Sequence, residues 1–212
     1  MTDAQTKPEA CNHVTEIGQR IQVVGNSCAG KSTAAERLGS ALSIPFIDLD
    51  ALNWEPGWVA LTETNAEEFE RRLTAATVGD AWVVAGDYRK FSQKLLWNRL
   101  ETVVWLDLPV YRLLGRLARR TVGRWRSQEL LWGTNTEQLW THFKIWDKHA
   151  SLLAWIVTQH RRKRRKRRRM IETMKDPRWE HIQFIRLVSE SEVDTFLQSV
   201  QTSTKSDTTG KR

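Results

Sequence analysis

Cysteine, tyrosine, methionine and proline are all scarce in this chain of 212 residues, and no long apolar run is present. The two cysteines, Cys11 and Cys28, are too few for a disulfide framework, so a reducing cytoplasm suits the chain best. The N-terminal residues lack the apolar centre of a secretory signal. The longest apolar stretch, Leu152 to Val157, is far too short to cross a bilayer, and we expect a soluble protein without membrane contact.

The formal charge of +8 has a local origin. Nine of the 33 basic residues occupy positions 161–169 without interruption, and the other 24 face 25 acidic residues, which gives a charge of −1. The charge therefore describes this basic run and not the whole surface. Consecutive cations can neutralise the phosphates of nucleic acid, although no aromatic residue interrupts them to stack on bases. The alternative is a solvated continuation of a long helix.

Strand and helix patterns alternate between two polar ends. Residues 1–19 and 201–212 carry no hydrophobic period, and we expect disordered tails there. Residues 20–200 are long enough for one domain with an insertion. The alternation predicts parallel strands with right-handed crossovers and helices on both faces of the sheet. The expected strands are 21–24, 45–47, 81–85, 102–106 and 182–185, and the expected helices are 31–42, 67–76, 109–120 and 192–200.

The stretch from about residue 119 to residue 176 interrupts this alternation. It is too long for an ordinary connection, so we expect a helical insertion. Apolar residues within it recur at alternating steps of four and three, which predicts one face of a single long helix packed against the rest of the protein. These residues are Leu139, Phe143, Trp146, Ala150, Leu153 and Val157.

The most specific motif is Gly-x4-Gly-Lys-Ser, placed between the first expected strand and the first expected helix. Its glycines let backbone amides turn inward around phosphate oxygens, and the helix directs its positive end to the same place. Lys31 would reach the β- and γ-phosphates of ATP, and Ser32 would give its hydroxyl to Mg²⁺. The alternative is a coincidental glycine turn. The expected nucleotide-binding residues are Gly25, Asn26, Ser27, Cys28, Ala29, Gly30, Lys31, Ser32 and Thr33.

Candidate site carboxylates follow two of the expected strands, at the edge of a parallel sheet where ligands collect. Asp48 and Asp50 come after the second strand, and their spacing suits two tasks. One carboxylate could hold a water on Mg²⁺, and the other could orient an acceptor hydroxyl or accept its proton. The alternative is that one of them only caps a helix expected from Ala51. Asp87 follows the third strand. Any one of Asp48, Asp50 and Asp87 could therefore be the carboxylate that serves magnesium.

Arginines supply the positive charge that phosphoryl transfer needs. Arg89 lies in the segment from Gly86 to Lys90 and is the best candidate to clamp a phosphate or carboxylate, with an ordinary surface arginine as the alternative. Arg116 and Arg120 are four residues apart in an expected helix and share one face. That face could compensate the charge of a transferring phosphoryl group.

With the glycine loop, Asp48, Asp50, Arg89 and the Arg116/Arg120 pair in place, the chain resembles the adenylate-kinase-like superfamily of small P-loop kinases. It resembles most closely the bacterial "topology modulation protein" group. The similarity covers about residues 20–200. The segments that carry it are Pro45 to Leu52, Trp54 to Trp58, Trp82 to Tyr88, and Arg186-Leu187 before a closing helix.

The resemblance implies an α/β protein with the three-layer α/β/α P-loop NTPase fold. It implies a five-stranded parallel sheet in the order 2-3-1-4-5, an acceptor-binding segment at about 50–78 and a helical lid within about 119–176. The implied activity is a kinase that moves the γ-phosphoryl group of Mg-ATP to a small hydroxyl- or phosphate-bearing acceptor. We expect Trp54, Trp58 and Tyr88 to shape the acceptor pocket.

The resemblance also implies roles for single residues. Arg116 matches an arginine that lies on the adenine, and Arg89 and Arg120 match arginines that contact phosphate. Asp50 matches an acceptor-side carboxylate, so the expected catalytic residues are Lys31, Asp50, Arg89 and Arg120.

We assign Ser32 and, through a water, Asp48 to Mg²⁺. Related sequences often show Asp-Gly-Asn-Tyr where this chain has Ala85 to Tyr88, and this departure puts the metal-binding carboxylate in doubt. A rival function is an ATP-gated nucleic-acid-binding protein that affects DNA topology through residues 161–169.

Overall fold

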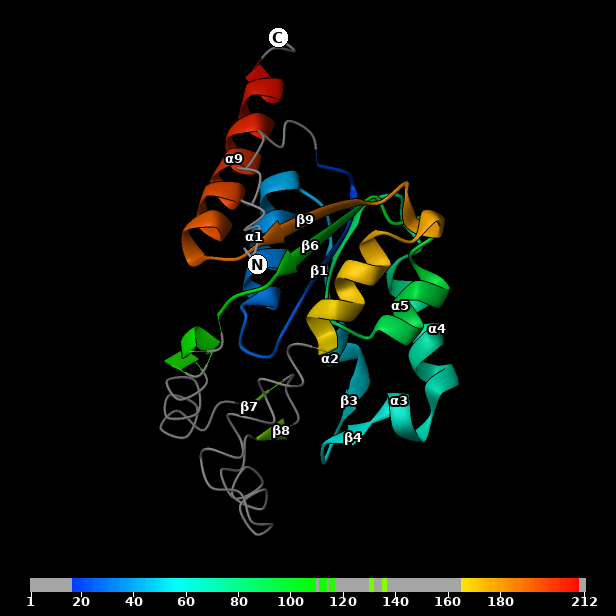
Figure 1. Cartoon of the computed structure of the whole chain (residues 1–212). Coiled ribbons are helices and arrows are strands. Elements are labelled where there is room, and N and C mark those ends of the chain that lie inside the picture. Colours follow the sequence, from blue (N-terminus) through cyan, green and yellow to red (C-terminus); the bar gives the residue numbers. More distant parts are fainter. Residues whose placement is uncertain are drawn as a thin grey trace.

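The computed structural model of the chain describes residues 17–109, 111–113, 115–116, 130–131, 135–136 and 165–209 (Figure 1). At its centre lies a five-stranded sheet in which every neighbouring pair is parallel. The spatial order is β2-β5-β1-β6-β9, which in chain order is 2-3-1-4-5 and confirms the expected sheet. The strands are β1 Arg20–Gly25, β2 Phe46–Asp48, β5 Trp82–Ala85, β6 Thr102–Leu106 and β9 Gln183–Leu187.

The central strand β1 carries apolar side chains on both faces. Ile21 and Val23 belong to one buried cluster, and Val24 belongs to the other. Successive side chains of a strand point to opposite faces, so both faces of the sheet need a cover of helices.

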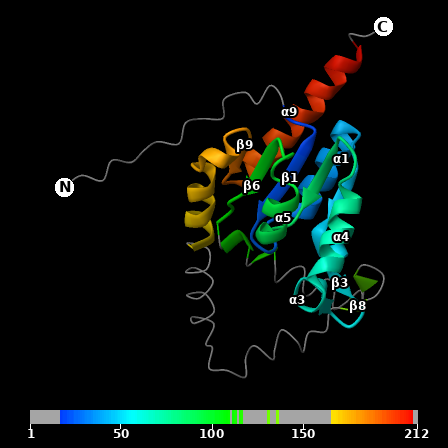
Figure 2. The ribbon, with the colours of Figure 1, turned by 90° about the vertical axis from the view of Figure 1, so that its right-hand side faces the viewer.

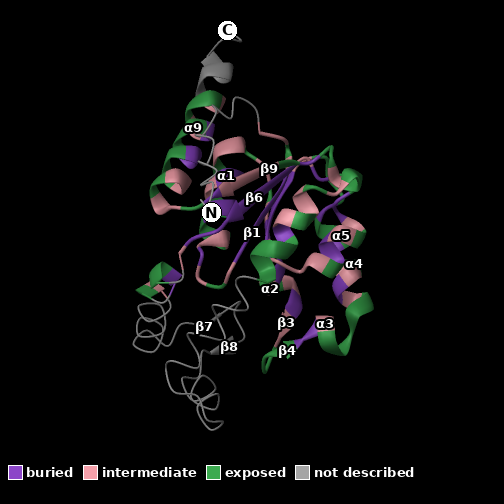
Figure 3. Ribbon diagram, viewed as in Figure 1, coloured by how far each residue is buried: buried purple, intermediate pink, exposed green. Residues whose placement is uncertain are grey.

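Helices cover both faces and produce three layers (Figures 1 and 2). Helices α1 and α9 pack on one face, where Ala34, Leu38, Phe196 and Leu197 join the cluster of Ile21. On the other face, α4, α5 and a helix at residues 165–174 contribute to the cluster of Val24. The inner strands β5, β1 and β6 are buried between these layers, whereas the edge strands β2 and β9 are partly exposed (Figure 3). The bounds of these labelled helices are α1 Lys31–Leu42, α4 Ala66–Ala76, α5 Arg89–Leu95 and α9 Glu190–Thr209.

A small unit of short elements follows β2, within the segment expected to bind the acceptor. The strands β3 and β4 pair antiparallel, and the rings of Trp54 and Trp58 meet edge to face with centroids 5.6 Å apart. Arg72 of α4 forms an ion pair of 2.6 Å with Glu55, which ties this hairpin to the domain. The elements are α2 Leu49–Asn53, β3 Trp54–Glu55, β4 Val59–Ala60 and α3 Leu61–Thr64.

The expected C-terminal tail is largely wrong, because α9 continues to Thr209. Serine and threonine hydroxyls in this part of the helix donate to carbonyl groups in the preceding turn, so a composition that suggests a loop is accommodated in a helix. Thr202 donates to Gln198 at 2.9 Å and Ser203 donates to Ser199 at 3.0 Å.

At the other end, residues 17–19 are attached to the sheet, because Glu101 accepts the amide of Gln19 at 2.6 Å. The expected N-terminal tail otherwise lies outside the described residues.

The described part of the insertion contains strands as well as a helix. The strands β7 Leu130–Leu131 and β8 Asn135–Thr136 form an antiparallel pair, which the expected helical insertion did not include. Three residues separate the two strands, a common hairpin spacing that helical periodicity does not reveal. A helix at 165–174 and a 3-10 turn, η2 Pro177–Trp179, complete the described part. The stripe from Leu139 to Val157 lies outside the described residues.

A buried polar network connects the centre of the sheet to the loop after β5. The Gln22 side chain donates to the Gly86 carbonyl at 3.1 Å and to the Ser92 hydroxyl at 3.0 Å, and it accepts from the Trp97 indole at 2.9 Å. Every partner in this network is buried. The network therefore fixes the backbone at Gly86, directly before Asp87. None of the described helices has the length and apolar character needed to span a membrane.

Candidate active site

The loop between β1 and α1 presents backbone amides at a helix N-terminus. Gly30 is the N-cap of α1 with φ of 88°, a left-handed conformation that glycine adopts without strain. No described side chain caps the first turn of α1. The amides of Lys31, Ser32 and Thr33 are therefore suited to receive an anion at the positive end of the helix dipole.

Lys31 lies in the same loop with its ammonium turned back on the backbone. Its Nζ donates to the Asn26 carbonyl at 3.1 Å. Burial lowers the pKa of Lys31, while the carboxylates of Asp50 and Asp87 act in the opposite direction. The ammonium is thus a partly desolvated cation, for which a polyphosphate would be a better partner than a single carbonyl.

Asp48 connects the loop to the second strand. Its Oδ1 accepts the backbone amide of Asp50 at 2.9 Å, which caps α2, and its Oδ2 accepts the Ser32 hydroxyl at 3.1 Å. The two roles weighed from the sequence are therefore compatible, and α2 begins at Leu49 rather than Ala51. Burial raises the pKa of Asp48, because the charged form is partly desolvated.

A hydroxyl and a carboxylate at this distance fit a magnesium ion that arrives with a nucleotide. Ser32 would bind such an ion directly, and Asp48 would hold one of its waters. No group of three or more acidic, histidine or cysteine side chains in the described residues is placed to hold a metal ion. Phosphate oxygens and water would therefore supply the remaining ligands.

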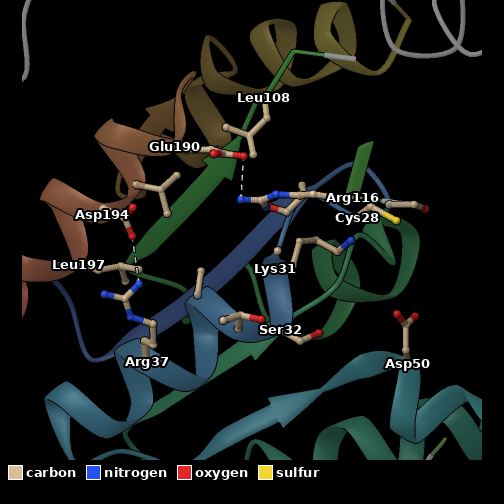
Figure 4. Close-up of a pocket in the computed structure, with 16 residues that line it drawn as sticks. Cys28, Lys31, Ser32, Arg37, Asp50, Leu108, Arg116, Glu190, Asp194 and Leu197 are labelled. Atoms are coloured by element: carbon tan, nitrogen blue, oxygen red, sulfur yellow. Dashed lines mark hydrogen bonds and ion pairs between the residues drawn. The ribbon is translucent and has the colours of Figure 1, made fainter. Parts of the chain in front are cut away.

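A pocket of about 580 Å³ opens beside the loop, within the size range of small-ligand sites. Figure 4 shows Glu190 and Asp194 of α9 at one end and Asp50 at the other, with Lys31 and Ser32 between them. The pocket therefore extends from α9, across the phosphate-binding loop, to the segment after β2. Its length suits a ligand whose phosphates lie in the middle.

Arg116 connects the loop with α9. Its Nη1 donates to the Ala29 carbonyl at 3.1 Å, and its Nη2 forms an ion pair with Glu190 at 3.0 Å (Figure 4). Both contacts hold the guanidinium at the α9 end of the pocket. From the resemblance, we expect this arginine to lie on the adenine of the nucleotide. We did not predict Glu190 from the sequence. Its position after the last strand of a parallel sheet was the available signal.

Asp50 lies at the opposite end with a tyrosine behind it. The Tyr88 hydroxyl donates to Oδ1 of Asp50 at 2.6 Å. Burial and the neighbouring Asp50 carboxylate raise the pKa of Tyr88, so the phenol stays protonated. The structure thus brings together two residues that the sequence assigned separately to catalysis and to pocket shape.

Asp87 faces the phosphate-binding loop but is paired with a residue of the basic run. Lys166 Nζ lies 3.2 Å from its Oδ2, and both charges act on Lys31. Next to this pair, Arg167 and Arg186 contact the buried carboxylate of Asp107 at 3.4 Å and 2.7 Å. These ion pairs attach the helix at 165–174 to the carboxyl edge of the sheet.

Arg89 is held by the same helix. It donates to the Thr173 hydroxyl at 3.1 Å and to the Met170 sulfur at 3.6 Å, and burial lowers its pKa. It lines a small hollow beside Gly25 and Asn26 and does not line the main pocket. Its expected contact with phosphate stays a prediction.

The basic run is only partly described, because residues 161–164 lie outside the described residues, as does Arg120. In the described part, Lys166 pairs with Asp87, Arg167 pairs with Asp107, and Arg168 pairs with Glu172. These contacts within the domain do not favour the nucleic-acid role. The sequence signal for packing was Met170 and Met174, whose spacing of four places both on the apolar cluster.

No protein-family model matches the sequence, and no sequence among the curated proteins does. Solved structures with a similar course of the chain include a gluconokinase from Sinorhizobium meliloti 1021, at 19% identity and a TM-score of 0.46, over 88% of this chain and 91% of that one. A shikimate kinase from Aquifex aeolicus matches at 17% identity and a TM-score of 0.42, over 90% and 99% of the two chains. A shikimate kinase from Bacteroides thetaiotaomicron matches at 17% identity and a TM-score of 0.47, over 86% and 96%. At identities and TM-scores this low, none of these proteins identifies the activity of this chain.

The strand order and the loop together define the class of fold. A parallel sheet in the order 2-3-1-4-5, with a Gly-x4-Gly-Lys-Ser loop between its central strand and the first helix, is the three-layer α/β/α fold of P-loop proteins. This fold places the site at the carboxyl ends of the strands.

Proposed function

We propose that this chain is a P-loop phosphotransferase, which moves the γ-phosphoryl group of Mg-ATP to a small acceptor bearing a hydroxyl or phosphate group. The main support is the geometry of the loop. The left-handed Gly30 opens the first turn of α1, Lys31 lies in the pocket, and the Ser32 hydroxyl touches Asp48. These three features are what a bound polyphosphate with its magnesium ion requires.

The α9 end of the pocket would hold the nucleoside. Arg116, fixed between Ala29 and Glu190, would lie on the base, and the residues from Gly25 to Thr33 would surround the phosphates. An arginine guanidinium over a base combines stacking with positive charge beside the α-phosphate.

Lys31 would neutralise the charge that develops between the β- and γ-phosphates during transfer. Magnesium, when bound with the nucleotide, neutralises the same oxygens. Ser32 and Asp48 would hold it, Asp48 through a water, and Asp87 is the third carboxylate near this position.

The opposite end would hold the acceptor. Asp50, which lines the pocket, would contact it directly. Trp54 and Trp58 do not line the pocket and would shape the acceptor side from the adjacent hairpin. Arg89 and Arg120 would contact phosphate oxygens when the insertion closes as a lid and excludes water. A member of the topology modulation protein group would have this arrangement of the site and would be located in the cytoplasm.

The proposal is tested by measuring consumption of Mg-ATP by the purified protein. We expect slow hydrolysis alone and faster consumption with the right acceptor, because an acceptor completes the site and displaces water. A panel of nucleoside monophosphates, sugars, polyols and hydroxy acids is the first screen. ATP consumption that no panel member stimulates, and that Lys31→Ala leaves unchanged, would contradict the proposal.

A further inference from the structure

The acceptor end of the pocket contains a carboxylate that is held on one side only. Oδ1 of Asp50 accepts the hydroxyl of Tyr88 at 2.6 Å, and the Tyr88 ring packs on Phe69 with centroids 5.3 Å apart. Among the described residues, none donates a hydrogen bond to Oδ2. The carboxylate is therefore fixed through one oxygen and presents the other to the pocket that it lines.

The direction of this hydrogen bond follows from the chemistry of its partners. A carboxylate only accepts, so the single proton of the Tyr88 hydroxyl is directed to Oδ1 of Asp50. Asn53 is buried, and its own Oδ1 accepts the amide of Thr62 at 3.0 Å, so this oxygen is already engaged.

Charge restricts what can approach Oδ2. The negative charges of Asp48, Asp50 and Asp87 all act to raise the pKa of the Lys31 ammonium, so this end of the site carries more than one carboxylate. The positive charge of Lys166 next to this group is already engaged by Asp87. An attacking phosphate oxygen would bring further negative charge against Asp50, whereas an uncharged hydroxyl would donate a hydrogen bond to it.

We propose that the acceptor attacks with an alcohol hydroxyl, as in a sugar, polyol or hydroxy acid, and that Tyr88 is a positioning residue that aims Asp50 at the proton of this hydroxyl. This inference rests on the proposed phosphotransferase function and selects between its two acceptor classes. The hydroxyl oxygen forms a bond to the γ-phosphorus, and the bond from that phosphorus to the bridging oxygen of the β-phosphate breaks. The nucleoside diphosphate leaves, and the hydroxyl proton passes to Oδ2 of Asp50 and then to solvent.

The experiment compares acceptor classes with the full-length protein and Mg-ATP. The hydroxyl panel is glycerol, glucose, gluconate and shikimate, and the phosphate panel is AMP, CMP, UMP and GMP. Phosphorylated products are measured together with hydrolysis, in which water takes the place of the acceptor hydroxyl. We expect a product from the hydroxyl panel and none from the phosphate panel.

Two variants test the roles of the side chains. Asp50→Asn should lower kcat for transfer, and for hydrolysis by water, about 100-fold or more, because a general base is lost. Tyr88→Phe should lower kcat about 10-fold, since one hydrogen bond to a charged group is lost. The KM for ATP should stay unchanged in both, a split that a general loss of structure would not produce.

The chain offers matched controls for both variants. Its only other tyrosine, Tyr111, is 67% exposed, and Tyr111→Phe should leave kcat unchanged. Asp80 is an exposed carboxylate, and Asp80→Asn should behave in the same way.

The outcomes separate this inference from the function on which it rests. Transfer to a nucleoside monophosphate would overturn the inference and leave the phosphotransferase in place. Full activity of Asp50→Asn, or of Tyr88→Phe, would also overturn it. No transfer to any acceptor or to water, with Mg-ATP bound, would remove the phosphotransferase function and this inference together.

Discussion

The hydroxyl of Ser32 donates to Oδ2 of Asp48 at 3.1 Å and so joins the first turn of α1 to the end of β2. The other oxygen of the same carboxylate caps α2 through the amide of Asp50. One side chain thus fixes the phosphate-binding loop and the acceptor-side carboxylate relative to each other. Loss of Asp48 should therefore affect both ends of the site.

Replacement of Asp48 by asparagine should change the pH dependence of stability. Burial raises the pKa of this carboxyl in the folded protein. Its contribution to stability is then fully present below its ordinary pKa and is lost as the pH rises through the folded value. The variant avoids this loss, so its Tm relative to that of the wild type should increase as the pH rises above the ordinary pKa of an aspartate, about 3.9.

Thermal denaturation across this pH range checks the prediction, with the exposed Asp80→Asn as a control that shows no such trend. A Tm of Asp48→Asn that falls relative to that of the wild type as the pH rises would contradict this prediction and show that the Asp48 carboxylate stabilises the free protein. Magnesium-dependent ATP binding should weaken in Asp48→Asn whichever way stability moves.

Lys31→Ala should abolish activity without unfolding the protein. Loss of a cation that stabilises transferred charge lowers kcat by about 100-fold or more. Because burial lowers the pKa of Lys31, removal of the ammonium also removes a desolvated charge from the free protein. The free energy of unfolding should stay within about 1 kcal/mol of the wild type, as measured by denaturant titration. The exposed Lys90→Ala serves as the control, and retained activity in Lys31→Ala would exclude the loop from the mechanism.

Arg116→Ala should weaken ATP binding more than it affects catalysis. The guanidinium is held at the α9 end of the pocket by Ala29 and Glu190, away from Asp50. We expect an approximately 10-fold higher Kd for ATP, which corresponds to about 1.4 kcal/mol. Glu190→Gln should produce a smaller change of the same sign. Arg112→Ala, an exposed arginine outside the pocket, should bind ATP normally, and equal weakening in both arginine variants would contradict the assignment.

Gln22→Leu should destabilise the domain through the loop after β5. The substitution leaves the Gly86 carbonyl and the Trp97 indole without their partner in a buried place. Each unsatisfied group costs about 1–3 kcal/mol, so for these two groups we expect a loss of about 2–6 kcal/mol in denaturant unfolding. Gln198→Leu on the exposed side of α9 is the matched control, and a loss of similar size there would refute the role of the network.

The sheet and the phosphate-binding loop could be predicted because they depend on local patterns. The apolar run at β1 followed by glycines and a helical period gave the bounds of α1 correctly, from Lys31 to Leu42. The position of Asp48 and Asp50 after a strand also predicted that both lie at the carboxyl edge of the sheet, where the structure has them. These signals lie within a few residues of the features that they predict.

Other parts depend on contacts between distant segments and left little trace in the sequence. The basic run looks like a solvated helix, and only the structure shows that Lys166 reaches Asp87 and Arg167 reaches Asp107. The pairing of Tyr88 with Asp50 joins the loop after β5 to the first turn of α2, 38 residues earlier in the sequence. In α9, hydroxyls that donate within the helix replace the apolar period that would have shown its full length.

The central claim is that the amides from Gly25 to Thr33 and the Lys31 ammonium bind a polyphosphate. The most direct measurement is a titration of the purified protein with Mg-ATP by isothermal calorimetry, in parallel with Lys31→Ala. We predict saturable binding at one site in the wild type, with a Kd of the order of micromolar to millimolar, and greatly weakened binding in the variant. Equal binding of Mg-ATP by the two proteins, or none by the wild type at millimolar nucleotide, would contradict the account.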